Sequence, residues 1–268
     1  MFHTIKQGTL EYLTADALEG SVHCFSTRLG GVSEGQLSSL NLGTHRGDKP
    51  ENVRENYRIL GKAVGFAPEE TVFTRQEHTD LLLRVGRADC GTGLDREQTT
   101  VCDGILTDEP GVALVCFAAD CTPVLLFDPV RQAIAAVHAG WRGTAQGIAY
   151  KAVLRMQEEF GCAPEDICAA IGPCIGRCCF EVGPEVSDAM REALGADAEA
   201  AIEPRGEKAH VDLKLLNRIW LQKAGVQGID VSPDCTMCHP DRFWSHRVTG
   251  GARGSQAAII RLKGGAAQ

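Results

Sequence analysis

The sequence lacks several features that would assign it to a specialised class of protein. Among its 268 residues, no apolar run approaches the ~20 residues that a membrane-spanning helix needs. Residues 1–8 lack the apolar core of a secretory signal. Basic residues are few: 27 Lys and Arg stand against 35 Asp and Glu, a formal net charge of −8, whereas general nucleic-acid binding requires basic patches. We therefore expect a cytoplasmic protein that binds neither membranes nor nucleic acids.

A nucleotide-binding P-loop is also missing. The polar stretch 27–43 contains four glycines near Arg28, but no Gly-Lys-Ser/Thr sequence follows them. This composition suits either a backbone that approaches a ligand closely or an irregular turn. The residues alone do not decide between the two.

The hydrophobic pattern is that of an α/β protein. With 44% hydrophobic and 23% charged residues, the chain can bury a sizeable core. Short apolar runs predict strands covered on both faces at 112–117, 124–127 and 133–137. Apolar residues at helical spacing predict helices at about 53–64, 144–160, 184–194 and from Asp212 onward. Since strands and helices alternate irregularly, we predict an α/β fold in a single domain, residues 1–268, with a mixed β-sheet flanked by helices.

Twelve cysteines are many for a cytoplasmic chain. A disulfide framework is typical of short secreted proteins, and this chain is long and carries no signal. Cysteines such as Cys116, Cys162 and Cys168 stand in apolar or alanine-rich runs. We expect them to be small buried hydrophobes.

Cys235 and Cys238 have the spacing of half a zinc knuckle. The other half would have to come from Cys174, Cys178 or Cys179, because the chain has no second Cys-x-x-Cys. We expect local turn packing here rather than a structural zinc. The adjacent Cys178 and Cys179 are no evidence of a disulfide, since neighbouring cysteines rarely meet the required geometry.

Three residues stand at the ends of apolar strands, next to turns: His78, Cys121 and His138. Strand ends at one edge of a sheet are where open α/β folds gather their sites. Two imidazoles and a thiolate are good ligands for Zn²⁺, and three protein ligands leave a fourth position for water or substrate. Water bound there becomes a nucleophile near neutral pH.

Two other interpretations of these residues stay open. Cys121 could be a nucleophile with His138 as its base, and Asp120 or Asp103 would then orient the imidazole. Alternatively, one of the three is a hydrogen-bonded core histidine and the other two are unrelated buried groups.

Three arginines lie in glycine-rich or polar loops: Arg28, Arg142 and Arg247. Guanidinium groups suit bidentate binding of phosphate or carboxylate. Each arginine by itself is expected to be solvated or structural. Convergence of all three on one pocket would indicate an anion site.

Several segments together closely resemble the laccase-domain family, also called the YfiH-type or multicopper polyphenol oxidase-like family. The most specific are Ala-Asp-Cys at 119–121 and His-Ala-Gly-Trp-Arg-Gly-Thr at 138–144. The other matches occur in the family's order at 25–33, 39–43, 76–78, 171–176, 211–213 and 245–247. The family includes proteins described as purine nucleoside phosphorylases and as a peptidoglycan editing factor.

The resemblance implies an α/β fold with a metal site formed by His78, Cys121 and His138, which would also be the catalytic residues. Zinc is the expected ion and copper the alternative. A multicopper oxidase needs several coppers and more clustered histidines than the eight in this chain.

The resemblance also implies a purine nucleoside enzyme that cleaves adenosine, inosine and methylthioadenosine with phosphate, and that could deaminate adenosine. Arg28 and Arg247 would hold phosphate, and Asn41 would hydrogen-bond the sugar or base. The expected partners are thus small molecules. Three rivals stay open: a hydrolase that edits peptidoglycan precursors by removing a wrongly added serine, a copper-dependent polyphenol oxidase, and a non-enzymatic zinc-binding protein.

The chain departs from the family pattern around the first metal histidine. Glu77 and Thr79 replace the usual Val and Gly on either side of His78. Glu77 is expected to place a carboxylate near the metal, where it could alter the metal preference. Phe180 stands where Tyr is common, so any role of that hydroxyl is absent.

Overall fold

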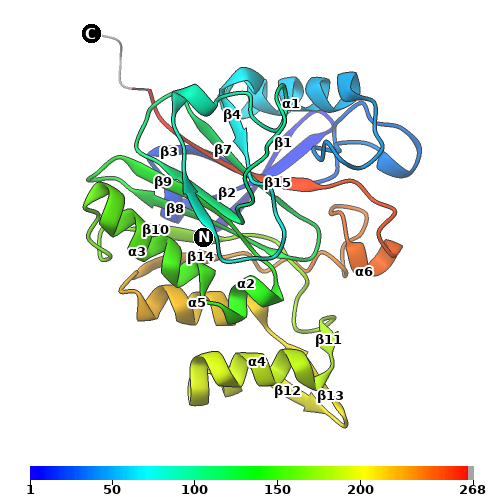
Figure 1. The fold of residues 1–268 in the computed structure, drawn as a ribbon. Helices are drawn as coiled ribbons and strands as arrows, with labels where there is room; N and C mark the ends of the chain where they lie inside the picture. Colours follow the sequence, from blue (N-terminus) through cyan, green and yellow to red (C-terminus); the bar gives the residue numbers. More distant parts are fainter. Residues whose placement is uncertain (265–268) are drawn as a thin grey trace.

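The computed structural model describes residues 1–264, and two six-stranded sheets lie face to face at its centre (Figure 1). In spatial order, the first sheet consists of β1 (Phe2–Gln7), β2 (Leu10–Ala15), β3 (Ser21–Ser26), β15 (Gln256–Leu262), β7 (Ala113–Ala118) and β4 (Thr71–Phe73). The second consists of β14 (Gly228–Val231), β10 (Cys168–Ile171), β8 (Thr122–Asp128), β9 (Ala133–Ala139), β6 (Gly104–Thr107) and β5 (Leu82–Arg84). Both sheets are mixed, because β4 runs parallel to β7, and β5 to β6, among antiparallel pairs.

The main core fills the space between the two sheets. Leu114 of β7 points into it from the first sheet and Leu125 of β8 from the second. Because side chains alternate along a strand, the neighbouring Val115 points to the opposite face. There it packs against α1 (Pro50–Val64), whose Tyr57 is fully buried.

The far side of the second sheet is covered by α3 (Ile148–Phe160) and α5 (Leu213–Lys223). A second layer of core joins Leu126 of β8 to Met156 and Leu221 of these helices. The layers therefore run from α1 through the first and second sheets to α3 and α5 (Figure 1). The predicted α/β class with helices flanking mixed β-structure is confirmed, although the strands form two stacked sheets and a small third one rather than one sheet.

One predicted helix, 144–160, is divided in the structure. α2 (Trp141–Ala145) ends before Gly147, whose φ of 72° is left-handed, and α3 begins immediately afterwards. The Trp220 indole N–H donates to the Thr144 carbonyl at 2.8 Å, the group that residue 148 would bond in a continuous helix. A left-handed residue at this break favours glycine.

A smaller unit follows β10 and forms the lower part of Figure 1. Its three-stranded sheet has the order β11 (Glu181–Val182), β13 (Lys208–Val211), β12 (Ile202–Arg205). The helix α4 (Pro184–Leu194), which was predicted, packs in one cluster with this sheet and with α5 through the fully buried Met190 and Leu216. The short strands were not predicted.

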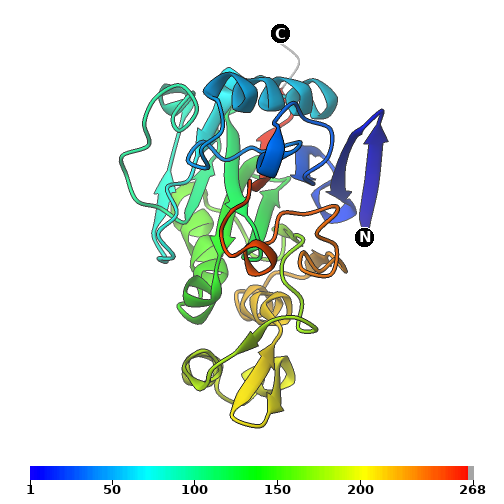
Figure 2. The ribbon, with the colours of Figure 1, turned by 90° about the vertical axis from the view of Figure 1, so that its right-hand side faces the viewer.

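The remaining elements are short. They are α6 (His246–Thr249) and the 3-10 helices η1 (Asp16–Leu18), η2 (Gly35–Leu37), η3 (Pro68–Glu70), η4 (Arg87–Asp89) and η5 (Gly195–Ala201). Figure 2 shows the β1–β2 hairpin at the outer edge of the first sheet. Among residues 1–264, no helix combines the length and the apolar composition needed to cross a membrane. The assignment of residues 1–268 to one domain stays a prediction.

The Asp212 side chain caps α5, because its Oδ1 accepts a hydrogen bond from the Leu215 N–H at 3.0 Å. Asp212→Ala removes this acceptor and should lower the free energy of unfolding by about 1 kcal/mol in urea denaturation. The control Glu192→Ala, at an exposed position of α4, should change it by less than about 0.5 kcal/mol. Equal values for the two variants would contradict the capping role.

Candidate metal centre

Strand register brings two of the predicted ligands together. β8 and β9 are antiparallel, with Thr122 opposite Ala139. Cys121, immediately before β8, therefore lies beside the end of β9 that carries His138. His78 arrives from the loop that connects β4 of the first sheet to β5 of the second.

The three side chains converge on one point. Their ligand atoms all lie within 4.8 Å of one another, and the two imidazole rings stand 5.0 Å apart at an interplanar angle of 70°. His138 is buried, Cys121 is partly buried and His78 is exposed. This group, called the His-Cys-His site below, is therefore accessible from solvent on one side.

A buried carboxylate orients both histidines. Nδ1 of His138 donates to Asp103, immediately before β6, at 2.8 Å. Asp103 also accepts from the backbone N–H groups of residues 77–79, at 3.2, 3.1 and 2.8 Å, and from the Thr79 hydroxyl at 2.7 Å. It thus holds His138 through the ring and His78 through the backbone. Since Nδ1 of His138 faces Asp103, Nε2 is left to face a metal.

Asp103 and His138 stabilise each other's charged forms in the metal-free protein. Burial alone would raise the pKa of Asp103, but hydrogen bonds from His138 and Thr79 hold it at about 2, below the usual 3.8. Burial alone would lower the pKa of His138, but Cys121 and Asp103 raise it from 6.5 to about 9. A metal that binds His138 must therefore displace its proton.

Asp120 fastens a distant segment beside the site. Its carboxylate accepts hydrogen bonds from the Thr236 hydroxyl at 2.6 Å, the Ser245 hydroxyl at 3.1 Å and the Arg247 backbone N–H at 2.7 Å. Of the two carboxylates that the sequence offered to orient the imidazole, the structure therefore favours Asp103.

Backbone strain is concentrated at the same place. Three non-glycine residues between 1 and 264 have a left-handed φ: His78 at 60°, Asp120 at 83° and Gln132 at 51°. Such conformations persist only where the surroundings impose them, and they cluster at functional sites. The hydrogen bonds that Asp103 accepts from the loop with His78, and those that Asp120 accepts from its partners, supply that constraint for the first two.

Gly140 leaves room where the three ligands meet. A Cβ at this position would lie 2.5 Å from Nδ1 of His78 and 3.3 Å from Sγ of Cys121. The φ of Gly140 is −65°, which any residue can adopt. The close approach of the two ligands, and not the backbone conformation, therefore requires glycine.

Arg28, a predicted phosphate ligand, is engaged in loop contacts. Its guanidinium donates to the carbonyls of Ser38 and Pro240 at 2.9 and 2.8 Å. It also stacks over the Trp244 ring at 3.9 Å. These contacts join three segments of the chain, and binding of phosphate by Arg28 stays a prediction.

Asn41, the predicted ligand of the sugar or base, is fully buried. Its amide donates to Asp48 at 2.9 Å and to the Gly43 carbonyl at 3.2 Å, and its Oδ1 accepts from the Ser255 N–H at 3.0 Å. A substrate contact would require some of these bonds to break, and that contact stays a prediction.

Arg247 is held close to the His-Cys-His site by its backbone bond to Asp120. Its exposed guanidinium donates to the Glu181 carbonyl at 3.1 Å and lies 5.6 Å from the Phe180 ring. The exposed Arg142 is also near, since its charge adds to burial in lowering the pKa of His78. Both arginines are placed where an anion could reach them.

The two departures from the family pattern act differently. Glu77 is exposed and lies 3.9 Å from Nε of Arg75, outside the group of ligand atoms. Thr79 donates its hydroxyl to Asp103, which the usual glycine could not do. An effect of Glu77 on metal preference stays a prediction.

Arg46 and Arg253 form a pair near the site that was not predicted from the sequence. Arg46 and Arg253 both donate to the Ser255 hydroxyl at 3.2 Å, and within residues 1–264 Nε of Arg253 is buried with no hydrogen-bond partner. Burial and the charge of Arg46 lower the pKa of Arg253 to about 10. Gln256, three residues after Arg253, pairs with Ala118, two residues before Asp120, so the two segments are neighbours.

Open space adjoins this arginine pair. Both arginines line a cavity of about 400 Å³, and Arg46 also lines a neighbouring cavity of about 440 Å³ bounded by Gln76 and Glu77. The three candidate metal ligands line neither cavity; His78 follows directly after Glu77 on the wall of the larger one. Two guanidinium groups beside open space suit an anion. The available signal was Arg253 within the glycine-rich stretch 250–254.

The chemistry of the His-Cys-His site fits a transition metal. Two imidazole nitrogens and one thiolate are ligands that zinc and copper accept, and three protein ligands leave a position for another molecule. His138 also has the carboxylate partner that metal-bound histidines usually have. The residues therefore define a candidate metal centre in an α/β protein.

Comparison with known proteins identifies the class. The model of the family described as multi-copper polyphenol oxidoreductase laccase matches residues 22–263, and the chain belongs to this family. The resemblance noted from the sequence is thereby confirmed.

Individual relatives match nearly the whole chain. A purine nucleoside phosphorylase of Bacteroides thetaiotaomicron is 38% identical over 247 residues, which cover 90% of this chain and 91% of that protein. The purine nucleoside phosphorylase YfiH of Escherichia coli is 37% identical over 229 residues, 85% of this chain and 89% of that protein. The crystal structure of YlmD from Geobacillus stearothermophilus is similar with a TM-score of 0.91 and 36% identity, over 97% of this chain and 99% of that chain.

Gly140→Ala should weaken zinc binding by at least about tenfold, because the added methyl group displaces His78 and Cys121. A chelator-competition titration measures the affinity. Gly228→Ala is the matched control: its Cβ would lie 3.4 Å from Sγ of Cys168, an ordinary contact. Equal zinc affinities for the two variants would show that Gly140 does not create the space for the ligands.

Asp103→Asn should destabilise the metal-free protein in a pH-dependent way. The folded pKa of Asp103 lies below its usual value, so its contribution is present above about pH 3.8 and is lost as the pH falls toward 2. The folded pKa of His138 lies above its usual value, so its contribution is present below about pH 6.5 and is lost as the pH rises toward 9.

The loss of unfolding free energy in Asp103→Asn should therefore be largest between about pH 3.8 and 6.5 in urea denaturation. Glu192→Gln, at an exposed position of α4, serves as the control. A loss that stays constant from pH 3 to 9 would contradict the ion pair.

Proposed function

We propose that this protein is a zinc-dependent purine nucleoside phosphorylase that cleaves adenosine, inosine and methylthioadenosine with phosphate. Relatives named purine nucleoside phosphorylase match nearly the whole chain and support this substrate class. Within the chain, the observation that carries the proposal is the arginine pair Arg46 and Arg253 next to the His-Cys-His site. An anion-binding feature and a metal-binding feature thus adjoin.

Phosphorolysis requires phosphate to be held against the ribose. A phosphate oxygen forms a bond to C1′ while the bond from C1′ to the purine nitrogen breaks, and the base leaves with that electron pair. Catalysis therefore depends on positioning phosphate and on stabilising a cationic sugar. We assign phosphate to Arg46 and Arg253, since Nε of Arg253 is a buried donor without a partner among the residues that the structure describes. Arg247 is exposed nearby and is assigned as a further phosphate contact.

The His-Cys-His site would hold the zinc ion through His78, Cys121 and His138. When bound, zinc supplies a Lewis acid at this position. Asp103 keeps a proton on Nδ1 of His138 and turns Nε2 toward the ion. Gly140 keeps the space between the ligands free. We include adenosine deamination as a second reaction of the same site.

Zinc is preferred over a multicopper centre because of the number of ligands. The chain contains eight histidines, and within residues 1–264 one group of candidate ligands contains two of them. A multicopper oxidase would need several such groups. A single copper ion is the alternative occupant of the same three ligands.

Arg28 and Asn41 contribute to this function through the loops that they hold. Arg28 ties the segment around Ser38 to that around Pro240, and Asn41 ties Asp48 to Ser255. Ser255 in turn accepts from both arginines of the pair. We therefore treat Asn41 as a positioning residue for the phosphate site, and Arg28 as a brace for the neighbouring loops.

A substrate panel tests the proposal. Zinc-loaded protein incubated with adenosine and phosphate should release adenine and ribose 1-phosphate, measured by chromatography, and His138→Ala should not. Release of inosine would report deamination. If no nucleoside is cleaved, turnover of a UDP-muramoyl-serine precursor would favour the editing hydrolase. In the same case, oxygen uptake with phenols would favour the oxidase. Equal adenine release by wild type and His138→Ala would refute the proposal.

Arg253→Ala should raise the KM for phosphate by about 10- to 100-fold, the value of a lost charged hydrogen bond. The KM for adenosine should change much less, because the substitution removes a phosphate contact. Arg205→Ala, at an exposed position of β12, is the control. An unchanged KM for phosphate would remove Arg253 from the phosphate site.

A further inference from the structure

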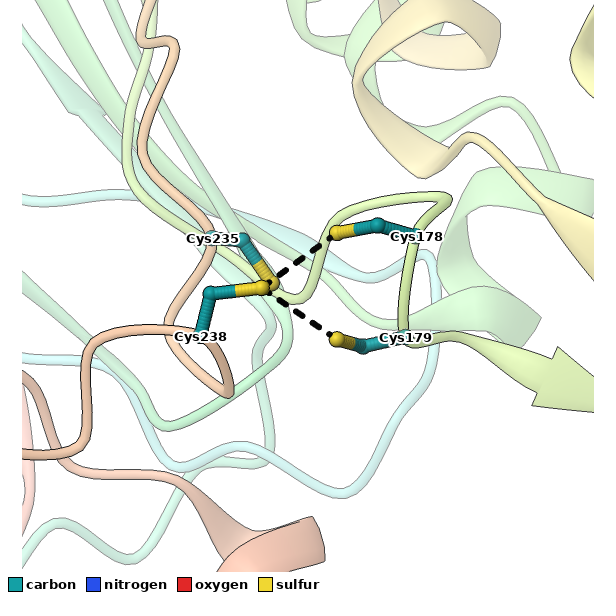
Figure 3. A group of neighbouring side chains, drawn as sticks. All are labelled: Cys178, Cys179, Cys235 and Cys238. Atoms are coloured by element: carbon teal, nitrogen blue, oxygen red, sulfur yellow. Dashed lines mark hydrogen bonds between the residues drawn. The ribbon is translucent and has the colours of Figure 1, made fainter.

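A second cluster of metal-binding side chains lies apart from the His-Cys-His site. Figure 3 shows cysteine side chains from two loops that point toward one another. Their sulfurs all lie within 4.8 Å of one another, and Sγ of Cys238 is 3.6 Å from that of Cys178 and 3.4 Å from that of Cys179. The members of this group, called the cysteine cluster below, are Cys178, Cys179, Cys235 and Cys238.

These distances suit a shared metal ion and not a disulfide. A tetrahedral zinc with Zn–S distances of ~2.3 Å places its sulfurs about 3.8 Å apart. A disulfide would place one pair at ~2.05 Å, whereas all four residues are free thiols. Thiol hydrogen bonds are weak and by themselves give little reason for four sulfurs to meet.

The surroundings prepare the sulfurs as ligands. The Gly176 N–H donates to Sγ of Cys235 at 3.1 Å, a contact that stabilises a thiolate. Cys235 is buried, while Cys178 and Cys238 are exposed, so an ion can enter from solvent. Cys174 is buried in the same loop but directs its Sγ to a backbone carbonyl and is not part of the cluster.

We propose that the cysteine cluster binds a zinc ion through four thiolates. Such an ion is structural, because four protein ligands leave no position for water or substrate. The proposal departs from the expectation of simple turn packing around Cys235 and Cys238, because the structure brings Cys178 and Cys179 to them from the loop after β10. This proposal does not depend on the proposed nucleoside chemistry.

The position of the cluster indicates what the ion holds together. One pair of cysteines follows β10 and the other follows β14, and the small unit with α4 and β11–β13 lies between them in the chain. An isolated backbone bridge already joins the two loops. Zinc would join the two loops that flank this unit in the chain. It would also fix the segment that carries Ser245 and Arg247 to Asp120.

Zinc content per chain tests the proposal. Reduced full-length protein is loaded with Zn²⁺, freed of excess metal and analysed by elemental mass spectrometry. Cys178→Ser combined with Cys238→Ser should hold one zinc ion fewer than wild type, and Cys121→Ser should independently lose the ion of the His-Cys-His site. The control is Cys168→Ser, a partly buried cysteine in β10, which should change nothing.

Cobalt substitution gives a readout on wild-type protein that does not depend on how the variants fold. Thiolate-to-cobalt absorption grows with the number of thiolates. A four-thiolate centre therefore absorbs more strongly than the His-Cys-His site, which has a single thiolate. Intense absorption that persists in Cys121→Ser supports the proposal. If Cys121→Ser abolishes the absorption, the proposal is wrong. It is also wrong if the native protein contains no metal and has a mass two hydrogens below that of the reduced chain. Neither result decides whether the wild-type protein cleaves nucleosides, so the two proposals fail separately.

Discussion

The buried carboxylate of Asp103 is the interaction on which the candidate centre depends. It precedes β6 of the second sheet and accepts five hydrogen bonds, four of them from the loop that leaves β4 of the first sheet. A buried charge is costly unless it is well paired, so this arrangement strongly favours one geometry. Since the fifth bond comes from His138, the position of the loop with His78 and the orientation of the second ring cannot vary independently.

The convergence of the three candidate ligands could be predicted from sequence, but the side chains that orient them could not. His78, Cys121 and His138 stand next to strand ends, and such positions meet at one edge of a sheet. Asp103 directly precedes β6 and Asp120 stands two residues before β8, so the two carboxylates look alike in sequence. Only the packing of the sheets directs one to an imidazole and the other to the segment 236–247.

The fold was predicted where burial leaves a clear pattern. α1 was visible from helical spacing, and β7–β9 from their apolar runs. The division into two sheets was not, because a strand covered by helices and one covered by another sheet are equally apolar. The β12–β13 hairpin has exposed polar positions, and contacts between distant residues, such as Arg46 with Ser255, leave no local signal.

The place of β15 in the first sheet has a consequence for biosynthesis. This strand lies between β3 and β7 and pairs with both, so one edge of each stays unpaired until Gln256–Leu262 has been made. Once β7 has been made, a chain emerging from the ribosome therefore carries two unpaired strand edges until β15 follows. Such edges invite wrong pairing with other chains. Completion of the sheet is thus a late, long-range step that makes this fold slow to form.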